Sequence, residues 1–171
     1  MPFPVLFGIS AAFGLAVWGA IAWQYIWAAL RERPSPENLK PILLLHGFRF
    51  LGLAFLVPGV VSPELPAAFA RPVAYGDFIT AILALLALAA LGTRAGIVMT
   101  WVFNMFGTAD LLFAFYQGAV ISLPDTPGLL GAGYFILAAY VPLLLITHGL
   151  VFRILLRTRV VVPFRSKLRT A

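Results

Sequence analysis

Residues 7–30 read FGISAAFGLAVWGAIAWQYIWAAL, a run of 24 residues without a charged side chain. An α-helix rises 1.5 Å per residue, so about 20 apolar residues cross the roughly 30 Å hydrocarbon core of a bilayer. The run ends at the charged, proline-containing segment 31–34, which a buried helix would not continue through. The stretch therefore predicts a transmembrane helix.

The composition supports the same conclusion for the whole chain. Of its 171 residues, 62% are hydrophobic and 11% are charged, and the mean hydropathy is +1.00. A water-soluble fold of this size has too little interior to hide so much apolar surface. The chain contains no cysteine, which excludes disulfides, thiolate metal sites and cysteine nucleophiles. Its net charge of +6 does not indicate nucleic-acid binding, because the cations flank apolar runs.

Four further spans are predicted at residues 41–61, 75–91, 97–117 and 130–156. Between the second and third, the segment 65–71 stands among closely spaced X-Pro steps, which favour an interfacial loop or a short surface helix. A basic tail, residues 157–171, follows the last span. We expect one all-α domain, a polytopic integral membrane bundle of five transmembrane helices.

The charges predict how this bundle is oriented. With five spans, one face carries nine cations: Arg31, Arg33, Lys40, Arg94, Arg157, Arg159, Arg165, Lys167 and Arg169. The other face carries Arg71 alone among cations, with Glu64, Asp77 and Asp125. The positive-inside rule then places the N-terminus outside and the C-terminus in the cytoplasm, in a bacterial cytoplasmic membrane. The tail is expected to rest on anionic headgroups, each cation contributing about 1 kcal/mol.

Polar residues within the predicted spans are the main functional signal, because an ionisable side chain at the bilayer centre costs about 2.5 to 3.5 kcal/mol. From the helix rise, His46, Arg49, Asn104 and His148 should converge in the cytoplasmic half of the bundle. Asp110 should lie near the midplane. The predicted intramembrane polar cluster consists of His46, Arg49, Asn104, His148, Asp110 and Gln117.

Arg49 and Asp110 have a structural and a functional interpretation. The structural one, which we favour, is a buried ion pair that neutralises both charges and holds the helix register. The functional one is an anion or headgroup site on Arg49. Asn104 is expected to form a hydrogen bond between helices, as amides commonly do in membrane bundles.

His46 and His148 are the only histidines in the chain. Two imidazoles can ligate a haem iron from opposite faces, and neighbouring aromatic residues would suit a haem or chlorin ring. They could instead form a protonatable pair in a proton pathway. The interpretation we favour is that each is hydrogen-bonded separately within the bundle.

Three classes of function follow from these residues. The preferred one is a non-enzymatic multi-pass membrane protein or membrane-complex subunit, in which polar residues hold the bundle together. The second is a small-molecule, ion or proton pathway lined by Arg49, Asp110 and the histidines, in a homo-oligomer or with other membrane subunits. The third is a haem or chlorin protein. No catalytic residue is predicted, since no Ser, His and acid constellation is evident and two histidines fall short of a zinc site.

Overall fold

The computed structural model describes residues 2–27, 36–126 and 128–158, and these segments contain helices and turns but no β-strand. The long helices are α1 (Phe3–Ile21), α4 (Ala67–Ala89), α5 (Arg94–Val120) and α6 (Val141–Thr158). α1 continues as the π-helical turn η1 (Ala22–Trp27), while η5 (Gly131–Gly133) and the π-helical η6 (Ile136–Tyr140) lead into α6. The remaining elements are η2 (Pro36–Leu39), α3 (Lys40–Gly47), η3 (Phe48–Leu56) and η4 (Leu123–Asp125).

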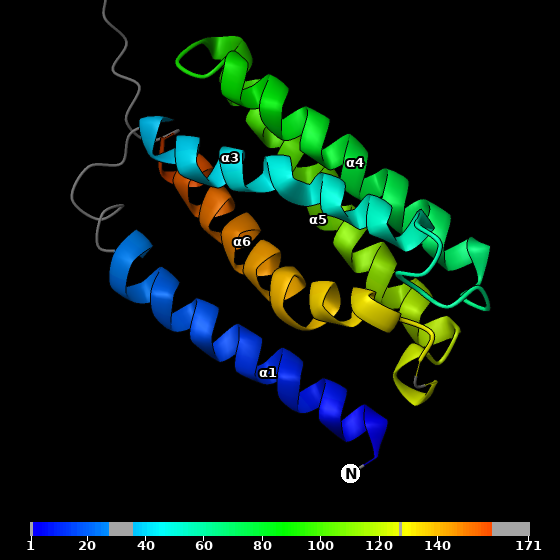
Figure 1. The fold of residues 1–171 in the computed structure, drawn as a ribbon. Coiled ribbons are helices and arrows are strands. Elements are labelled where there is room, and N and C mark those ends of the chain that lie inside the picture. Colours follow the sequence, from blue (N-terminus) through cyan, green and yellow to red (C-terminus); the bar gives the residue numbers. More distant parts are fainter. Residues whose placement is uncertain (1, 28–35, 127, 159–171) are drawn as a thin grey trace, which may run out of the picture.

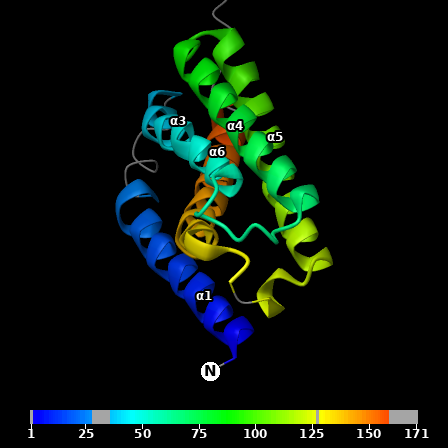
Figure 2. The same ribbon diagram turned by 45° about the vertical axis from the view of Figure 1, so that its right-hand side comes forward.

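The helices form a bundle with α1 at its edge (Figure 1). α4 and α5 lie side by side, α3 and η3 pack along α4, and α6 lies between this group and α1 (Figures 1 and 2). α1 is far less buried than the other long helices, and it packs mainly on α6 and η6. Lys40, Arg94 and Arg157 lie where α3 begins, where α5 begins and near where α6 ends. We call this the cation-rich end of the bundle.

Two apolar clusters fill the interior, one toward each end. The cluster at the cation-rich end includes Leu43, Ala84, Phe103 and Val151. The cluster toward the opposite end includes Phe55, Phe69, Val73, Ala74 and Leu123. Several buried polar side chains lie between them, and these form the candidate site.

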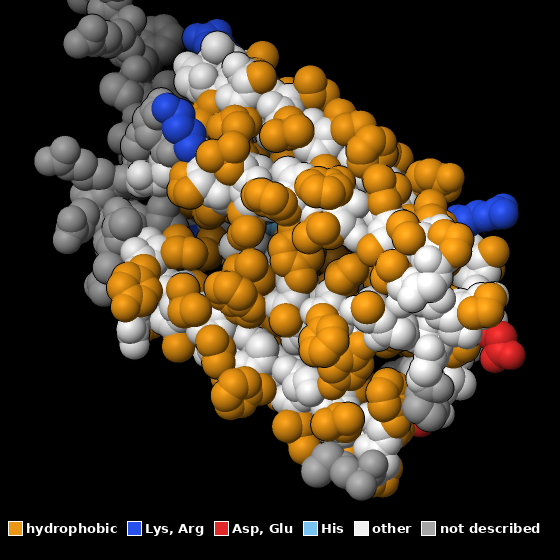
Figure 3. Space-filling model, in the orientation of Figure 1, with side chains coloured by type: hydrophobic (Ala, Val, Ile, Leu, Met, Phe, Trp, Pro, Cys, Tyr) orange, Lys and Arg blue, Asp and Glu red, His pale blue; other side chains and the backbone are white. Residues whose placement is uncertain are grey.

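Four helical stretches are long and apolar enough to cross a membrane: Phe3–Trp27, Ala67–Ala89, Arg94–Val120 and Gly131–Arg157. Figure 3 shows apolar side chains spread over the visible face and charged ones toward its edges. The prediction of an all-α chain with several apolar helices of membrane-spanning length is thereby confirmed for the described residues. Residues 28–30 of the first expected span and the tail beyond Thr158 lie outside the described residues.

The expected loop or surface helix at residues 65–71 is wrong, because α4 begins at Ala67 and runs unbroken through Pro72 to Ala89. Pro72 has no N–H to donate to the carbonyl of Ala68, four residues earlier. The Gln117 side-chain amide from α5 donates to that carbonyl at 3.2 Å instead. A neighbouring helix thus supplies the hydrogen bond that the proline cannot make.

The expected span 41–61 is shorter and changes its winding. Lys40–Gly47 is α-helical, Phe48–Leu56 is a 3₁₀-helix, and the chain becomes extended at Val57. Residues three apart lie in line along a 3₁₀-helix. The buried residues of η3 follow this period, since they are Arg49, Gly52 and Phe55.

α1 contacts both α6 and the π-helical turn η6 that leads into it. A Cβ on Gly14 would lie 2.5 Å from the carbonyl oxygen of Ala138, so only glycine permits this approach. Trp18 donates its indole N–H to the carbonyl of Ala139 at 2.9 Å. These contacts connect the edge helix to η6.

Candidate functional site: a buried guanidinium centre

Arg49 lies at the middle of the polar residues and is fully buried. Its Nε donates to Asp77 Oδ1 at 2.7 Å, and its Nη2 lies 2.6 Å from both Asp77 Oδ1 and Asp110 Oδ2. Its Nη1 donates to the Gly107 carbonyl at 3.2 Å and to His148 Nε2 at 3.0 Å. A guanidinium has five N–H donors, and Arg49 makes four hydrogen bonds with them, besides the ion-pair contact of Nη2 with Asp77. Arg49 thereby links η3 to α4, α5 and α6.

The hydrogen bonds determine the protonation of His148. Arginine can only donate, so His148 Nε2 must accept and carries no proton. The other ring nitrogen, Nδ1, is 2.8 Å from Asn104 Oδ1 and donates to it. Asn104 Nδ2 donates in turn to the His148 carbonyl at 3.3 Å. His148 is therefore a neutral imidazole held in one tautomer.

His46 lies beside this group, with its Nε2 at 2.9 Å from Thr147 Oγ1. The Thr147 hydroxyl donates to backbone carbonyls of its own helix, the nearer at 2.8 Å, so it accepts from His46. His46 Nδ1 is buried and has no hydrogen-bond partner among the described residues. A buried acceptor left without a donor costs about 1 to 3 kcal/mol, which a structure rarely retains without a reason.

Three glycines make room for the centre. Cβ atoms at Gly52 and Gly76 would collide with the carboxylates of Asp77 and Asp110. A Cβ on Gly107 would lie 2.7 Å from His148 Cε1 and 2.7 Å from a methyl group of Thr80. The charged side chains thus reach one another because neighbouring backbones carry no side chain.

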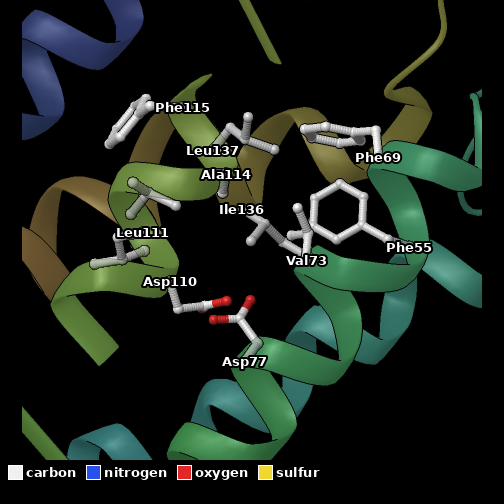
Figure 4. A pocket seen from close by; sticks show the side chains of 11 residues that line it. Phe55, Phe69, Val73, Asp77, Asp110, Leu111, Ala114, Phe115, Ile136 and Leu137 are labelled. Carbon is white, nitrogen blue, oxygen red and sulfur yellow. The ribbon is translucent and has the colours of Figure 1, made fainter. Parts of the chain in front are cut away.

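The two carboxylates also border a cavity of about 40 Å³, which we call the carboxylate cavity. Figure 4 shows Asp77 and Asp110 meeting at one end of it, while apolar side chains such as Phe55, Phe69 and Ile136 line the rest. The side chains of Asp77 and Asp110 are 11% and 10% exposed, whereas that of Arg49 is 0% exposed. Access to the centre therefore passes along the carboxylates.

Five of the six predicted residues come together: His46, Arg49, Asn104, Asp110 and His148. Gln117 is separate, because its amide bonds to Ala68. Asp77 was expected on the outer face, and the structure instead places it in the buried centre. That expectation followed from reading Pro72 as the end of a loop. The signal that could have found Asp77 is charge, because a buried arginine requires carboxylates.

The histidines do not fit the two sides of a haem iron. Axial ligands must lie on opposite faces of the macrocycle, but the rings of His46 and His148 are only 4.4 Å apart between centroids. Phe103 packs against both rings, at 4.9 Å and 5.3 Å. Both nitrogens of His148 are engaged with Arg49 and Asn104. No porphyrin or chlorin can enter between rings that already touch.

Comparison with known protein families gives a match to most of the chain. The model of a family described as a domain of unknown function, DUF8737, matches residues 6–156. The chain belongs to this family. The matched range contains every residue of the Arg49 centre. It also contains all or most of each of the four membrane-length stretches. No curated protein and no solved structure matches the chain.

Proposed function

We propose that the chain is a five-span protein of the bacterial cytoplasmic membrane whose Arg49 centre binds and exchanges a proton, as part of a proton pathway. Its N-terminus lies outside and its C-terminus in the cytoplasm. The observation that carries the proposal is charge: the centre holds two carboxylates and one guanidinium, and both carboxylates border a cavity.

The proposed five spans are the four membrane-length stretches and the segment Lys40–Leu56, which is the second span along the chain. Eight α-helical residues at 1.5 Å and nine 3₁₀ residues at about 2.0 Å give a rise of roughly 30 Å, the thickness of the hydrocarbon core. Because a 3₁₀-helix is more extended than an α-helix, these 17 residues suffice for a crossing. The antiparallel course of this segment along α4 supports the same count (Figure 1).

The excess negative charge indicates a proton. With Asp77 and Asp110 both ionised and His148 neutral, the centre carries one net negative charge, which is costly to keep at the middle of a membrane. One proton on the carboxylate pair removes it. Arg49 contacts Asp77 through Oδ1 and Asp110 through Oδ2, so Asp77 Oδ2 and Asp110 Oδ1 remain as the acceptors for that proton.

The size of the carboxylate cavity selects against larger ligands. Sites for small organic molecules occupy about 300 to 1,000 Å³, against about 40 Å³ here. One water needs roughly 10 to 15 Å³ of such space, so the cavity accommodates a few waters. Toward the cation-rich end, Phe103 and its apolar neighbours close the centre off. Proton exchange is therefore expected from the cavity side, and passage to the other side needs a rearrangement.

Proton flux into liposomes tests the proposal. Purified protein is reconstituted with an internal pH-sensitive dye, and a potassium gradient with valinomycin supplies the driving potential. We expect acidification above that of empty liposomes for the natural chain, and loss of this excess in Asp110→Asn. Asp125→Asn is the matched control, because Asp125 is exposed in η4, the short element after α5, and it should retain the flux.

Two outcomes would overturn the proton pathway. Equal acidification by the natural chain and Asp110→Asn would show that the centre plays no part in it. The second outcome combines two results. The natural chain shows no flux, and its infrared spectrum contains no protonated-carboxyl band that disappears in Asp110→Asn. Arg49 would then have a purely structural role. Replacing sodium by choline in both compartments distinguishes transport of a proton from transport of a small metal cation. Transport of the metal cation would stop, whereas transport of the proton would continue.

A further inference from the structure

A second cavity lies at the end of the bundle opposite to the cation-rich end. Its volume is about 460 Å³, more than ten times that of the carboxylate cavity. The loop after η3, residues 57–63, forms one side of it and the start of α4 the other. Its wall includes Arg71, which is exposed, so we call it the Arg71 vestibule. One water needs roughly 10 to 15 Å³ of such space, and the vestibule therefore has room for many waters.

The side chain of Phe55 lines both the Arg71 vestibule and the carboxylate cavity. Phe55 is only 3% exposed, and its ring packs edge-on against that of Phe69, with 6.1 Å between the centroids. Figure 4 shows the two rings together, apart from the carboxylates of Asp77 and Asp110. A Cβ on Gly133 would lie 3.0 Å from Phe55 Cε1, so the backbone of η5 also lies close to this ring. Phe55 thus forms a partition between the two cavities.

The distance across this partition is short compared with the length of the bundle. Arg71 lines the vestibule and Asp77 lines the carboxylate cavity, and both belong to α4. Asp77 follows Arg71 by six residues, which is a rise of about 9 Å along the helix axis. The vestibule therefore comes within a few residues of a carboxylate that contacts Arg49.

The loop at the rim of the vestibule is held by backbone hydrogen bonds. Ala132 donates its N–H to the carbonyl of Val60 at 2.8 Å, and Ser62 donates to the carbonyl of Leu129 at 3.1 Å. A shift of this loop would break both bonds. Rotation of the Phe55 side chain would break none, because an aromatic hydrocarbon ring has no hydrogen-bonding group. The ring is the part of the partition that can move at the lower cost.

We infer that the Arg71 vestibule is the route by which water and protons reach the carboxylate cavity, and that Phe55 controls this exchange. The inference deepens the proposed function and rests on it for the proton as the exchanged species. With the ring in place, an apolar side chain interrupts the chain of waters between the two cavities. With the ring turned aside, each water can accept one proton and donate another, so a proton that reaches the carboxylate pair leaves none missing behind it.

Silver ion is a suitable probe of this route, because it is small, moves through water and binds a thiolate. The chain has no cysteine, so one thiol can be placed at Ala67 in the vestibule or at Ala114 in the carboxylate cavity. The full chain in lipid nanodiscs is treated with silver nitrate for different times. The thiols left free are then counted with a fluorescent maleimide after denaturation. We expect fast reaction of Ala67→Cys and slow reaction of Ala114→Cys.

Substitution of Phe55 should open the partition. Phe55→Ala should accelerate the reaction of Ala114→Cys at least about tenfold, equivalent to about 1.4 kcal/mol of the barrier to access. Phe55→Leu should give a smaller acceleration, and it carries the test if the alanine variant does not fold. Phe69→Ala and Phe69→Leu are the matched controls, because Phe69 is equally buried and lines the carboxylate cavity but not the vestibule. Circular dichroism checks the folding of each variant.

Four outcomes would overturn the inference. Slow reaction of Ala67→Cys would show that the vestibule is closed to water. Reaction of Ala114→Cys as fast as that of Ala67→Cys in the natural background would show that no partition exists. An unchanged rate in the Phe55 variants would place the barrier elsewhere, and equal acceleration by the Phe69 variants would indicate a loosened core.

The proton flux assay reports separately on the proposed function. If the Arg49 centre carries protons, Phe55→Leu should raise the flux and Phe69→Leu should leave it unchanged. An unchanged flux in Phe55→Leu would overturn the control of proton exchange by Phe55, even if silver entered faster. Absence of flux in the natural chain would instead refute the proton pathway, while the silver reaction would still show whether the vestibule and the cavity are connected.

Discussion

A single guanidinium connects four helical elements, because arginine alone offers five donors in a planar fork. Arg49 makes four hydrogen bonds and a further ion-pair contact, and its partners come from α4, α5 and α6. Removing one partner of a buried ion pair lowers the stability of a fold strongly, because the other charge stays buried without compensation. The intact ion pair, in contrast, does not necessarily stabilise the fold. The residues of the centre should therefore respond very differently to substitution.

We predict that Arg49→Met lowers the free energy of unfolding by about 3 to 5 kcal/mol, because it leaves two carboxylates buried without a cation. Asp110→Asn should cost only about 1 kcal/mol or less, since Arg49 retains Asp77 and the centre becomes neutral. Arg49→Lys should rescue little, because an ammonium offers three donors from one point. Thermal unfolding in detergent, followed by circular dichroism, measures all three. Equal losses in Arg49→Met and Asp110→Asn would contradict the charge argument.

Gly107→Ala tests the close packing around His148. Its Cβ would fall within 2.7 Å of the imidazole and of Thr80, so we expect a loss of about 1 to 3 kcal/mol, as for other overpacked sites. Gly149→Ala, one residue after His148, meets no described atom within 4 Å and should change stability by less than about 0.5 kcal/mol. The same unfolding assay compares them. A tolerant Gly107→Ala would mean that the centre is loosely packed.

The sequence predicted much of this centre because depth along a helix follows from residue number. His46, Arg49, Asn104 and His148 could be placed at similar depths, with Asp110 within reach of Arg49. Asp77 could not be placed there, since the start of α4 depends on how Pro72 is accommodated. Nor could residue number show that the two imidazoles touch, because ring orientation depends on packing against Phe103.

At the scale of elements, the course of α4 depends on α5. A proline in the second turn of a helix normally leaves a carbonyl without its partner, and here the Gln117 amide donates to the Ala68 carbonyl. Local sequence rules do not account for such a donor from another helix. The π-helical turn η6 is equally non-local, since Gly14 and Trp18 of α1 contact it. The presence of these helices could therefore be predicted from the sequence, whereas the way in which each helix is wound could not.

A double-mutant cycle measures the coupling between Pro72 and Gln117. Gln117→Leu should cost about 1 kcal/mol in the natural chain, the value of one hydrogen bond. In a Pro72→Ala background it should cost almost nothing, because an alanine at this position restores a backbone N–H for the Ala68 carbonyl. Chemical or thermal unfolding of the four proteins gives the interaction energy. Additive effects would show that Gln117 stabilises α4 in another way.

At the scale of the whole molecule, the question is which segments cross the membrane. Four stretches have the required length and hydropathy, and we propose Lys40–Leu56 as a further span on the basis of its 3₁₀ rise. In a five-span chain Lys40 and Ala95 lie on the same side and Glu64 on the other. In a four-span chain Lys40 and Glu64 share a side, opposite Ala95.

The absence of cysteine from the chain makes this distinction direct. Single-cysteine variants Lys40→Cys, Glu64→Cys and Ala95→Cys are treated in intact cells with a membrane-impermeant maleimide. We expect labelling of Glu64→Cys alone, with the other two labelled only after permeabilisation. Labelling of Lys40→Cys together with Glu64→Cys would establish four spans and overturn the proposed topology.

The winding of η3 has a geometric consequence for the carboxylate cavity. Arg49, Gly52 and Phe55 share one line because the segment turns by a third of a revolution per residue. If the same residues adopted α-helical pitch, Phe55 would rotate by about 120° relative to Arg49, and the rise from Arg49 to Phe55 would shorten by about 3 Å. The guanidinium could keep its carboxylates while the aromatic ring left the cavity wall. The pitch of one short segment therefore determines whether the ring and the charge face the same space.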